Sequence, residues 1–244
     1  MNPSPVIFDC DGLLVDTHGH WDRAYTALFT RYRVTLRRDD RRRLVGLGLE
    51  RLGYALADLL GHPVPPGVLA QQIRELVATN AGAGVVALPG ALELVTTLVG
   101  TRPLAIASNS PAEITRDYLR TTGIPDTFET IVGAGDADHP KPAPDLYQET
   151  CRRLGVPCSR VVVLEDSLIG VQAARAADAT VFAIPKLPET LPVAHRSFPT
   201  LTDRELWNVL GLTAAPDVGT VPQPRHPGAN VQNGVAACPA TRPT

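Results

Sequence analysis

Acidic residues gather in two short segments, each directly after an apolar stretch that predicts a buried strand. The first segment places Asp9 and Asp11 two residues apart, with Gly12 behind them to permit a sharp turn. Two carboxylates in one buried pocket repel each other unless a cation balances them, and a hard ion such as Mg²⁺ prefers oxygen ligands. The second segment supplies two more carboxylates, Glu165 and Asp166. The alternative for the first segment is an Asp-rich turn, and the alternative for the second is a helix N-cap.

Two further segments carry groups suited to a phosphate. Ser108 follows another predicted strand, where its hydroxyl and nearby backbone N–H groups could hold a phosphate at the start of a helix. Lys141 has a proline on each side, which stiffens the backbone and fixes where the ammonium points. Of the 23 basic residues only Lys141 and Lys186 are lysines, so a lysine here departs from the habit of the chain. The alternative for Lys141 is a solvated lysine in a surface loop. The alternative for the segment around Ser108 is a plain helix start with Ser110 as the N-cap.

The elements that must position these groups alternate between strands and helices. Short apolar runs predict strands at Val6–Phe8, Leu104–Ala107, Val161–Leu164 and Thr180–Ile184. Helical patterns lie between the later strands, at Ala112–Thr121, Asp145–Leu154 and Gly170–Ala177. This alternation predicts an α/β fold with a doubly wound, Rossmann-like parallel sheet. In such a sheet the ligand lies beyond the carboxyl ends of the strands, where the acidic and phosphate-binding segments fall.

A block of helices interrupts the alternation after the first strand. Trp21–Tyr32, Leu49–Leu60 and Val68–Val77 carry apolar residues at helical spacing. No convincing strand is found from about Thr17 to Leu88. Near the C-terminus the composition changes to Pro, Gly, Ala and Thr, which predicts disorder. The predicted parts are an α/β catalytic core (1–16 and 88–212), an inserted all-helical cap (17–87) and a disordered tail (213–244).

The overall composition excludes several classes of protein. The net charge is -2, and 20% of residues are charged and 44% hydrophobic, which is ordinary for a globular chain. Nothing here favours a nucleic-acid or membrane partner, and no apolar run reaches the length of a membrane span. Without a signal peptide or a C-x-x-C pair, we expect a cytoplasmic protein with reduced thiols. The cysteines are Cys10, Cys151, Cys158 and Cys238.

Four segments in order along the chain resemble the signature motifs of the haloacid dehalogenase (HAD) superfamily. They read FDCDGLLVD, ASNS, PKPAPD and LEDSLIGVQAA, and the resemblance covers roughly Val6 to Leu210. It is closest to the phosphatase and phosphomutase branch that carries a helical cap after the first motif. The resemblance implies that Asp9 is the nucleophile that becomes an aspartyl phosphate, and that Asp11 is the general acid and base.

The resemblance also implies the remaining site. Ser108 and Lys141 would hold the transferring phosphoryl group, and the full set of phosphate- and substrate-binding candidates is Gly12, Ser108, Asn109, Lys141 and Arg51. Mg²⁺ would be the cofactor, with ligands drawn from Asp9, Asp11, Glu165 and Asp166. Arg51 lies where caps of this family place a specificity loop, and a surface helix residue is its alternative. His18 and His20 are weighed between substrate contacts and surface residues.

Residue types narrow the reaction. Asp11 favours phosphoryl chemistry over halide removal, and the absence of a lysine in the predicted cap excludes the Schiff-base cleavage of phosphonates. The sequence therefore predicts a magnesium-dependent phosphatase acting on a small phosphomonoester, a sugar phosphate or similar metabolite. A sugar phosphomutase of the β-phosphoglucomutase type is the alternative, and a non-catalytic binding protein on the same scaffold is the third. The substrate and the oligomeric state stay open.

Overall fold

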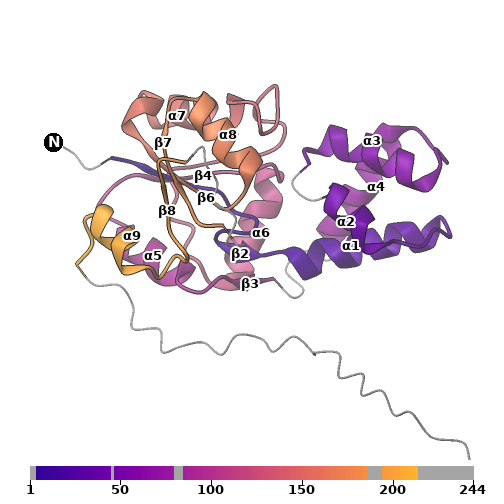
Figure 1. Ribbon diagram of the computed structural model, residues 1–244, viewed down its shortest axis with the longest axis horizontal. Coiled ribbons are helices and arrows are strands. Elements are labelled where there is room, and N and C mark those ends of the chain that lie inside the picture. Colours follow the sequence, from indigo (N-terminus) through magenta and orange to yellow (C-terminus); the bar gives the residue numbers. More distant parts are fainter. Residues whose placement is uncertain (1–3, 45–46, 80–84, 186–193, 214–244) are drawn as a thin grey trace, which may run out of the picture.

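The protein folds into a sheet with helices on both faces and a group of four helices beside it (Figure 1). This structure, a computed structural model, describes residues 4–44, 47–79, 85–185 and 194–213. The predicted tail, apart from Thr213, lies outside the described residues. None of the helices in the described ranges is long and apolar enough to cross a membrane.

The sheet has six parallel strands, which confirms the predicted α/β class. Their order is β5 (Thr130–Val132), β4 (Leu104–Ala107), β1 (Val6–Phe8), β6 (Val162–Glu165), β7 (Thr180–Ala183) and β8 (Arg196–Ser197). The first strand lies in the middle, with β4 on one side and β6 on the other. The order along the chain therefore reverses at β1, and a crevice for a ligand forms at such a switch point.

Successive residues of β1 point to opposite faces of the sheet, as strand geometry requires. Val6 and Phe8 join the apolar cluster that includes α5 (Ala91–Leu98), α6 (Ala112–Thr122) and α9 (Arg204–Val209). Ile7 joins the cluster on the other face, formed with α7 (Asp145–Leu154) and α8 (Leu168–Ala176). Figure 1 shows these two helical layers above and below the strands. The double burial explains why the central strand is apolar throughout.

Four helices leave the sheet between two short strands. They are α1 (His18–Arg31), α2 (Arg38–Leu44), α3 (Leu49–Leu60) and α4 (Pro66–Thr79), and we refer to them as the cap helices. The strands β2 (Val15–Asp16) and β3 (Val86–Ala87) pair antiparallel, so both connections to the cap helices run side by side. The expectation of no strand in this segment is wrong at β3, because a two-residue strand is defined by its partner and not by its own periodicity.

Two local predictions need correction. Ser110 is not a helix N-cap: α6 begins at Ala112 with Pro111 in the capping position. Cys151 and Cys158 form a disulfide, so the expectation of reduced thiols is wrong for this pair. The chain reverses at Gly155, with φ of +67°, and brings the two Cα atoms to 5.6 Å, a normal disulfide separation. Spacing alone does not reveal such a pair, because the turn between the cysteines sets the distance.

Candidate active site

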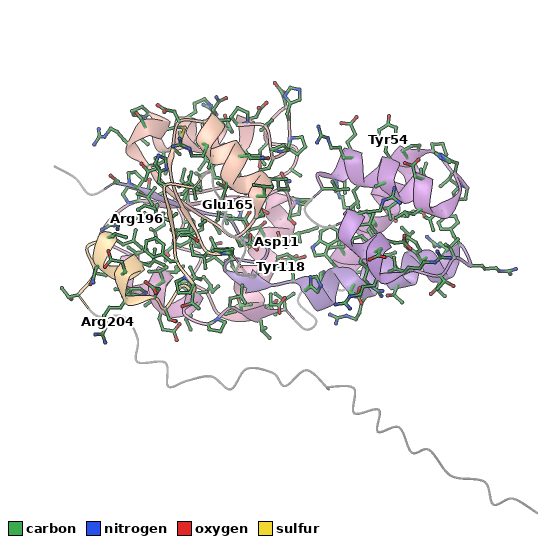
Figure 2. The ribbon with its side chains drawn as sticks, in the orientation of Figure 1. Asp11, Tyr54, Tyr118, Glu165, Arg196 and Arg204 are labelled. Atoms are coloured by element: carbon green, nitrogen blue, oxygen red, sulfur yellow. A yellow bond between two sulfur atoms is a disulfide. The ribbon has the colours of Figure 1, made fainter. Side chains whose placement is uncertain are left out.

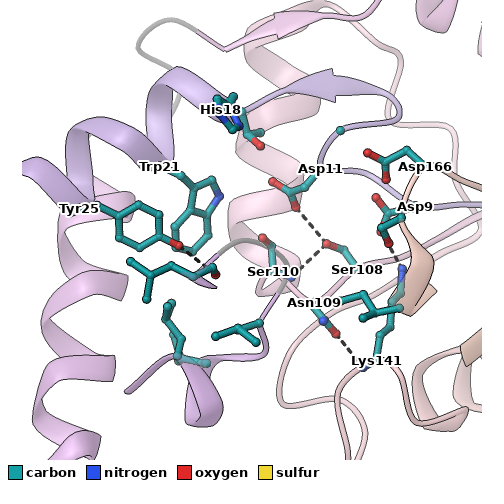
Figure 3. A pocket seen from close by; sticks show the side chains of 18 of the residues that line it. Asp9, Asp11, His18, Trp21, Tyr25, Ser108, Asn109, Ser110, Lys141 and Asp166 are labelled. Carbon is teal, nitrogen blue, oxygen red and sulfur yellow. Dashed lines mark hydrogen bonds and ion pairs between the residues drawn. The ribbon is translucent and has the colours of Figure 1, made fainter. Parts of the chain in front are cut away.

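The ends of β1 and β6 deliver two carboxylates to one buried ammonium. Lys141 Nζ lies 2.6 Å from Asp9 Oδ1 (Figure 3). It also lies 2.6 Å from Glu165 Oε1 and donates to the Ala107 carbonyl at 2.9 Å. Three acceptors match the three N–H bonds of an ammonium, so its position is fully determined. The exposed fractions are 7% for Asp9, 3% for Lys141 and 0% for Glu165. The predicted phosphate-binding lysine is therefore placed beside the predicted nucleophile.

The charges of Lys141, Asp9 and Glu165 shift the pKa values of Lys141 and Asp9. Burial acts to lower the pKa of Lys141, but Asp9 and Glu165 outweigh it and hold that pKa well above its usual value. Burial raises the pKa of Asp9, and Lys141 opposes this, while Glu165 and Asp166 raise it further. One buried cation thus faces several carboxylates. A second positive charge at this place would favour the ionised form of Asp9.

The acidic residues fit a divalent metal ion. Asp9, Glu165 and Asp166 can each offer a carboxylate oxygen, and these atoms lie within 4.8 Å of one another. Oxygen donors in this number suit Mg²⁺. Gly12 leaves room for the cluster: its φ is +100°, and a Cβ atom there would lie 2.2 Å from Asp166 Oδ2. The glycine in the first motif therefore permits both the turn and the approach of Asp166.

Glu165 has a second set of contacts that the sequence did not reveal. Its Oε1 accepts from the Tyr147 hydroxyl at 2.6 Å, in addition to Lys141. Its Oε2 accepts from the Ser167 hydroxyl at 3.1 Å and the Ser167 backbone N–H at 3.3 Å. Figure 2 shows Glu165 deep among the strands. These contacts orient the side chain that holds Lys141, and nothing in the spacing of Tyr147 or Ser167 indicates them.

Asp11 and Ser108 meet across the neighbouring strand ends. The Ser108 hydroxyl donates to Asp11 Oδ2 at 3.1 Å and accepts from the Ser110 backbone N–H at 3.0 Å (Figure 3). Asp11 Oδ1 is buried, and no group in the described part of the chain donates to it. Asn109 Oδ1 accepts from the Lys141 backbone N–H at 2.9 Å, which ties the second motif to the third. The second motif is thus hydrogen-bonded to both the first and the third.

These groups open into a cavity of about 290 Å³ between the sheet edge and the cap helices. The lining from the sheet side includes most of the predicted site, namely Asp9, Asp11, Gly12, Ser108, Asn109, Lys141 and Asp166. Glu165 lies behind Lys141 and does not line the cavity. The lining from the cap helices includes Trp21, Asp22, Tyr25, Arg41, Leu44, Leu49 and Leu52.

Three residues singled out in the predicted cap take different positions. Arg51 is exposed on α3 and does not line the cavity. His18 is exposed and lines the cavity rim, whereas His20 is buried, with its ring 5.5 Å from that of Tyr118. The expectation of a surface histidine is therefore wrong for His20. Arg41 of α2 forms an ion pair with Asp22 of α1 at the cavity.

The family model for haloacid dehalogenase-like hydrolases matches residues 6–184, which contain all four motifs and the cap helices. The chain belongs to this family. It is 31% identical to the fructose-1-phosphate phosphatase YqaB of Escherichia coli K12, over 70% of this chain and 91% of that protein. It is also 31% identical to hexitol phosphatase B of Escherichia coli O157:H7, over 84% of this chain and 96% of that protein.

A solved structure shares the same fold. The crystal structure of CbbY from Rhodobacter sphaeroides in complex with phosphate superposes with a TM-score of 0.72 at 26% identity, and it covers 82% of this chain and 95% of that one. The HAD fold and the named phosphatases among its relatives identify this protein as a phosphoric monoester hydrolase. The resemblance read from the four motifs is confirmed at the level of the family.

Proposed function

We propose that this HAD hydrolase is a magnesium-dependent phosphatase that cleaves a small phosphomonoester through an aspartyl-phosphate intermediate. The observation that carries the proposal is the convergence of Asp9, Asp11, Ser108 and Lys141 on one cavity, beside a carboxylate cluster. The two E. coli relatives are named for sugar and hexitol phosphates, which supports a phosphorylated metabolite of similar size. The proposed division into core (1–16 and 88–212) and cap (17–87) places this cavity between the two parts.

The two aspartates divide the reaction. An Asp9 carboxylate oxygen attacks phosphorus, an O–P bond forms, and the bond from phosphorus to the leaving oxygen breaks. Asp11, in its protonated form, gives its proton to that leaving oxygen. A water molecule then attacks the aspartyl phosphate while Asp11 accepts its proton, which releases inorganic phosphate and restores Asp9. Asp11 lines the cavity together with Asp9, which supports this exchange.

The remaining groups would hold the phosphoryl oxygens. Lys141 supplies a fixed positive charge, and Ser108 supplies a hydroxyl at the start of α6. We propose that Asp9 and Asp166 hold the ion and that Asp11 contributes its backbone carbonyl. Glu165 completes the group of carboxylates around the ion and orients Lys141. Bound Mg²⁺ supplies charge compensation that lets an anionic carboxylate approach an anionic ester.

The test is release of inorganic phosphate from a panel of phosphorylated metabolites, with Mg²⁺ and with a chelator. Asp9→Asn should lower kcat/KM by at least about 10³-fold, because the nucleophile is lost. Asp126→Asn is the matched control, since Asp126 is exposed and does not line the cavity. Unfolding curves of both variants check that the fold is intact. Turnover that survives in Asp9→Asn, or that ignores the chelator, would contradict the proposal.

The sugar phosphomutase is the second candidate, because it shares the Asp9 and Asp11 chemistry. It differs in the acceptor: a second sugar hydroxyl, and not water, would take the phosphoryl group. The same panel separates the two. A mutase gives isomerised sugar phosphate, depends on a bisphosphate activator and releases little inorganic phosphate.

A further inference from the structure

The cap side of the cavity is an apolar wall. It faces the predicted phosphate end, and Figure 3 shows Trp21 and Tyr25 on α1 across from Asp11 and Ser108. The Trp21 and Tyr25 rings lie 5.7 Å apart between centroids, at an angle of 35°. Four leucines extend the wall, and together the set is Trp21, Tyr25, Leu44, Leu47, Leu49 and Leu52, which we call the apolar wall.

Three of the polar residues on this side, Tyr25, Asp22 and Arg41, are engaged within the protein, and His18 lies at the rim of the cavity. The Tyr25 hydroxyl donates to the Leu44 carbonyl at 3.5 Å, which leaves the ring as the surface of the cavity. Asp22 and Arg41 form an ion pair, so their charges are matched within the protein. Leu44 and Leu52 are buried in the same apolar cluster as Tyr25, so this wall is held in place by packing. A rigid apolar surface remains for the ligand.

We propose that the natural substrate carries an apolar group of about one ring in size next to its phosphate, in place of a chain of hydroxyls. This inference rests on the proposed phosphatase function and specifies its substrate class. A polyol against the four leucines and the Tyr25 ring would lose hydrogen bonds to water without finding partners there. An apolar ring would gain from burial and from edge or offset contact with Trp21 and Tyr25. A cavity of about 290 Å³ lies at the small end for ligand pockets, which suits a single ring.

The experiment compares phosphate esters that differ only in the body of the leaving group. 2-Phenylethyl phosphate and cyclohexylmethyl phosphate are matched against fructose 1-phosphate and glucitol 6-phosphate, since all four are primary alkyl esters of similar reactivity. We expect kcat/KM to be at least about tenfold higher for the apolar pair. A preference for the sugar pair would overturn the inference while the phosphatase function stands.

Variants assign the preference to the wall. Trp21→Gln should lower the apolar-to-sugar ratio of kcat/KM by about tenfold or more, and Trp21→Phe should retain most of it. Tyr54→Gln is the control, because Tyr54 is 59% exposed on the outer side of α3 (Figure 2) and does not line the cavity. A ratio that Trp21→Gln leaves unchanged would overturn the assignment.

Binding separates the two proposals. Titration calorimetry on Asp9→Asn measures the affinity of the cavity for 3-phenylpropylphosphonate and for a matched polyol phosphonate, and neither compound is hydrolysed. Selective binding of the phenyl compound supports the apolar site even if no ester is hydrolysed, in which case the phosphatase proposal alone fails. Equal or weaker binding of the phenyl compound overturns the inference, whatever the turnover.

Discussion

At the scale of single residues, Gly12 has two separate reasons to be glycine. Its φ of +100° strains any other residue, and a Cβ atom would lie 2.2 Å from Asp166 Oδ2. Gly12→Ala should lower the free energy of unfolding by about 1–2 kcal/mol and weaken Mg²⁺ activation by about tenfold or more, because Asp166 must move. Denaturant unfolding and activity against Mg²⁺ concentration measure the two effects.

Gly135 provides the control for Gly12. Its φ is +94°, but a Cβ atom there would meet nothing within 4 Å. Gly135→Ala should therefore show the stability loss and leave the Mg²⁺ dependence unchanged. If both variants shift the Mg²⁺ dependence equally, the contact with Asp166 is not the cause.

His139 supplies a pH-dependent contribution next to the Lys141 loop. A hydrogen bond from its Nδ1 to Asp145 at 2.8 Å raises the pKa of His139 above its ordinary value of 6.5. A raised pKa in the folded state stabilises the protein below the unfolded pKa, and this stabilisation is lost as pH rises through the folded pKa. Asp145→Asn should lower the His139 pKa in NMR titrations and destabilise the fold more at pH about 5.5 than at pH about 8.

The helix dipole provides a check on this explanation. Asp145 begins α7, so Asp145→Asn also removes a favourable charge at a helix N-terminus. That loss does not depend on the protonation of His139, so it does not produce a difference between the two pH values. A destabilisation that is equal at both values would mean that His139 contributes nothing.

Most of the site residues could be predicted from the sequence, because their positions follow from strand ends. Asp9 and Asp11 follow β1, and Ser108 follows β4, so parallel strands bring them to one edge. The support of Glu165 by Tyr147 and Ser167 could not be predicted. It depends on how α7 packs against the sheet and on where a buried side chain ends.

At the scale of elements, Gly48 is where the cap helices pack against Pro140, the residue before Lys141. It precedes α3 with φ of -63°, and a Cβ atom there would lie 2.5 Å from both Cβ and Cγ of Pro140. Gly48→Val should push these elements apart without backbone strain, and kcat/KM should fall by about tenfold or more through misplaced cap residues. Steady-state kinetics measures the effect, and circular dichroism checks the helix content.

Gly67 is the matched control within the cap helices. It lies in α4, and a Cβ atom there would meet nothing within 4 Å. Gly67→Val should leave kcat/KM unchanged. A similar loss of activity in both variants would show that valine disturbs the cap helices in general. The close approach of Gly48 to Pro140 would then not explain the effect of Gly48→Val.

Strands with at least three consecutive buried residues were predictable, and the other strands were not. The four predicted strands match β1, β4, β6 and β7 to within one residue at each end, because each is a buried apolar run. The remaining strands, β2, β3, β5 and β8, have two or three residues each, of which at most two are buried.

At the scale of the whole molecule, the cavity lies between two parts that share one apolar cluster. That cluster contains Phe8 and Ile106 of the sheet together with Leu28 and Leu56 of the cap helices. The connection through β2 and β3 is only two strands wide, so packing and the site itself contribute to holding the parts together. A ligand that binds the acidic cluster should therefore stabilise the whole protein and not only a loop.

Mg²⁺ should raise the melting temperature even without substrate. Asp9, Glu165 and Asp166 lie close together with Lys141 as the nearby cation, so an added cation relieves their repulsion in the folded state and has no such site in the unfolded chain. At a concentration 100 times its Kd, an ion contributes about 2.7 kcal/mol, which corresponds to a shift of about 5–11 °C for a chain of this size. Differential scanning calorimetry at constant ionic strength measures it. Asp166→Asn should remove most of the shift and Asp126→Asn should keep it, because only Asp166 belongs to the cluster. An equal shift in both variants would place the stabilising ion elsewhere.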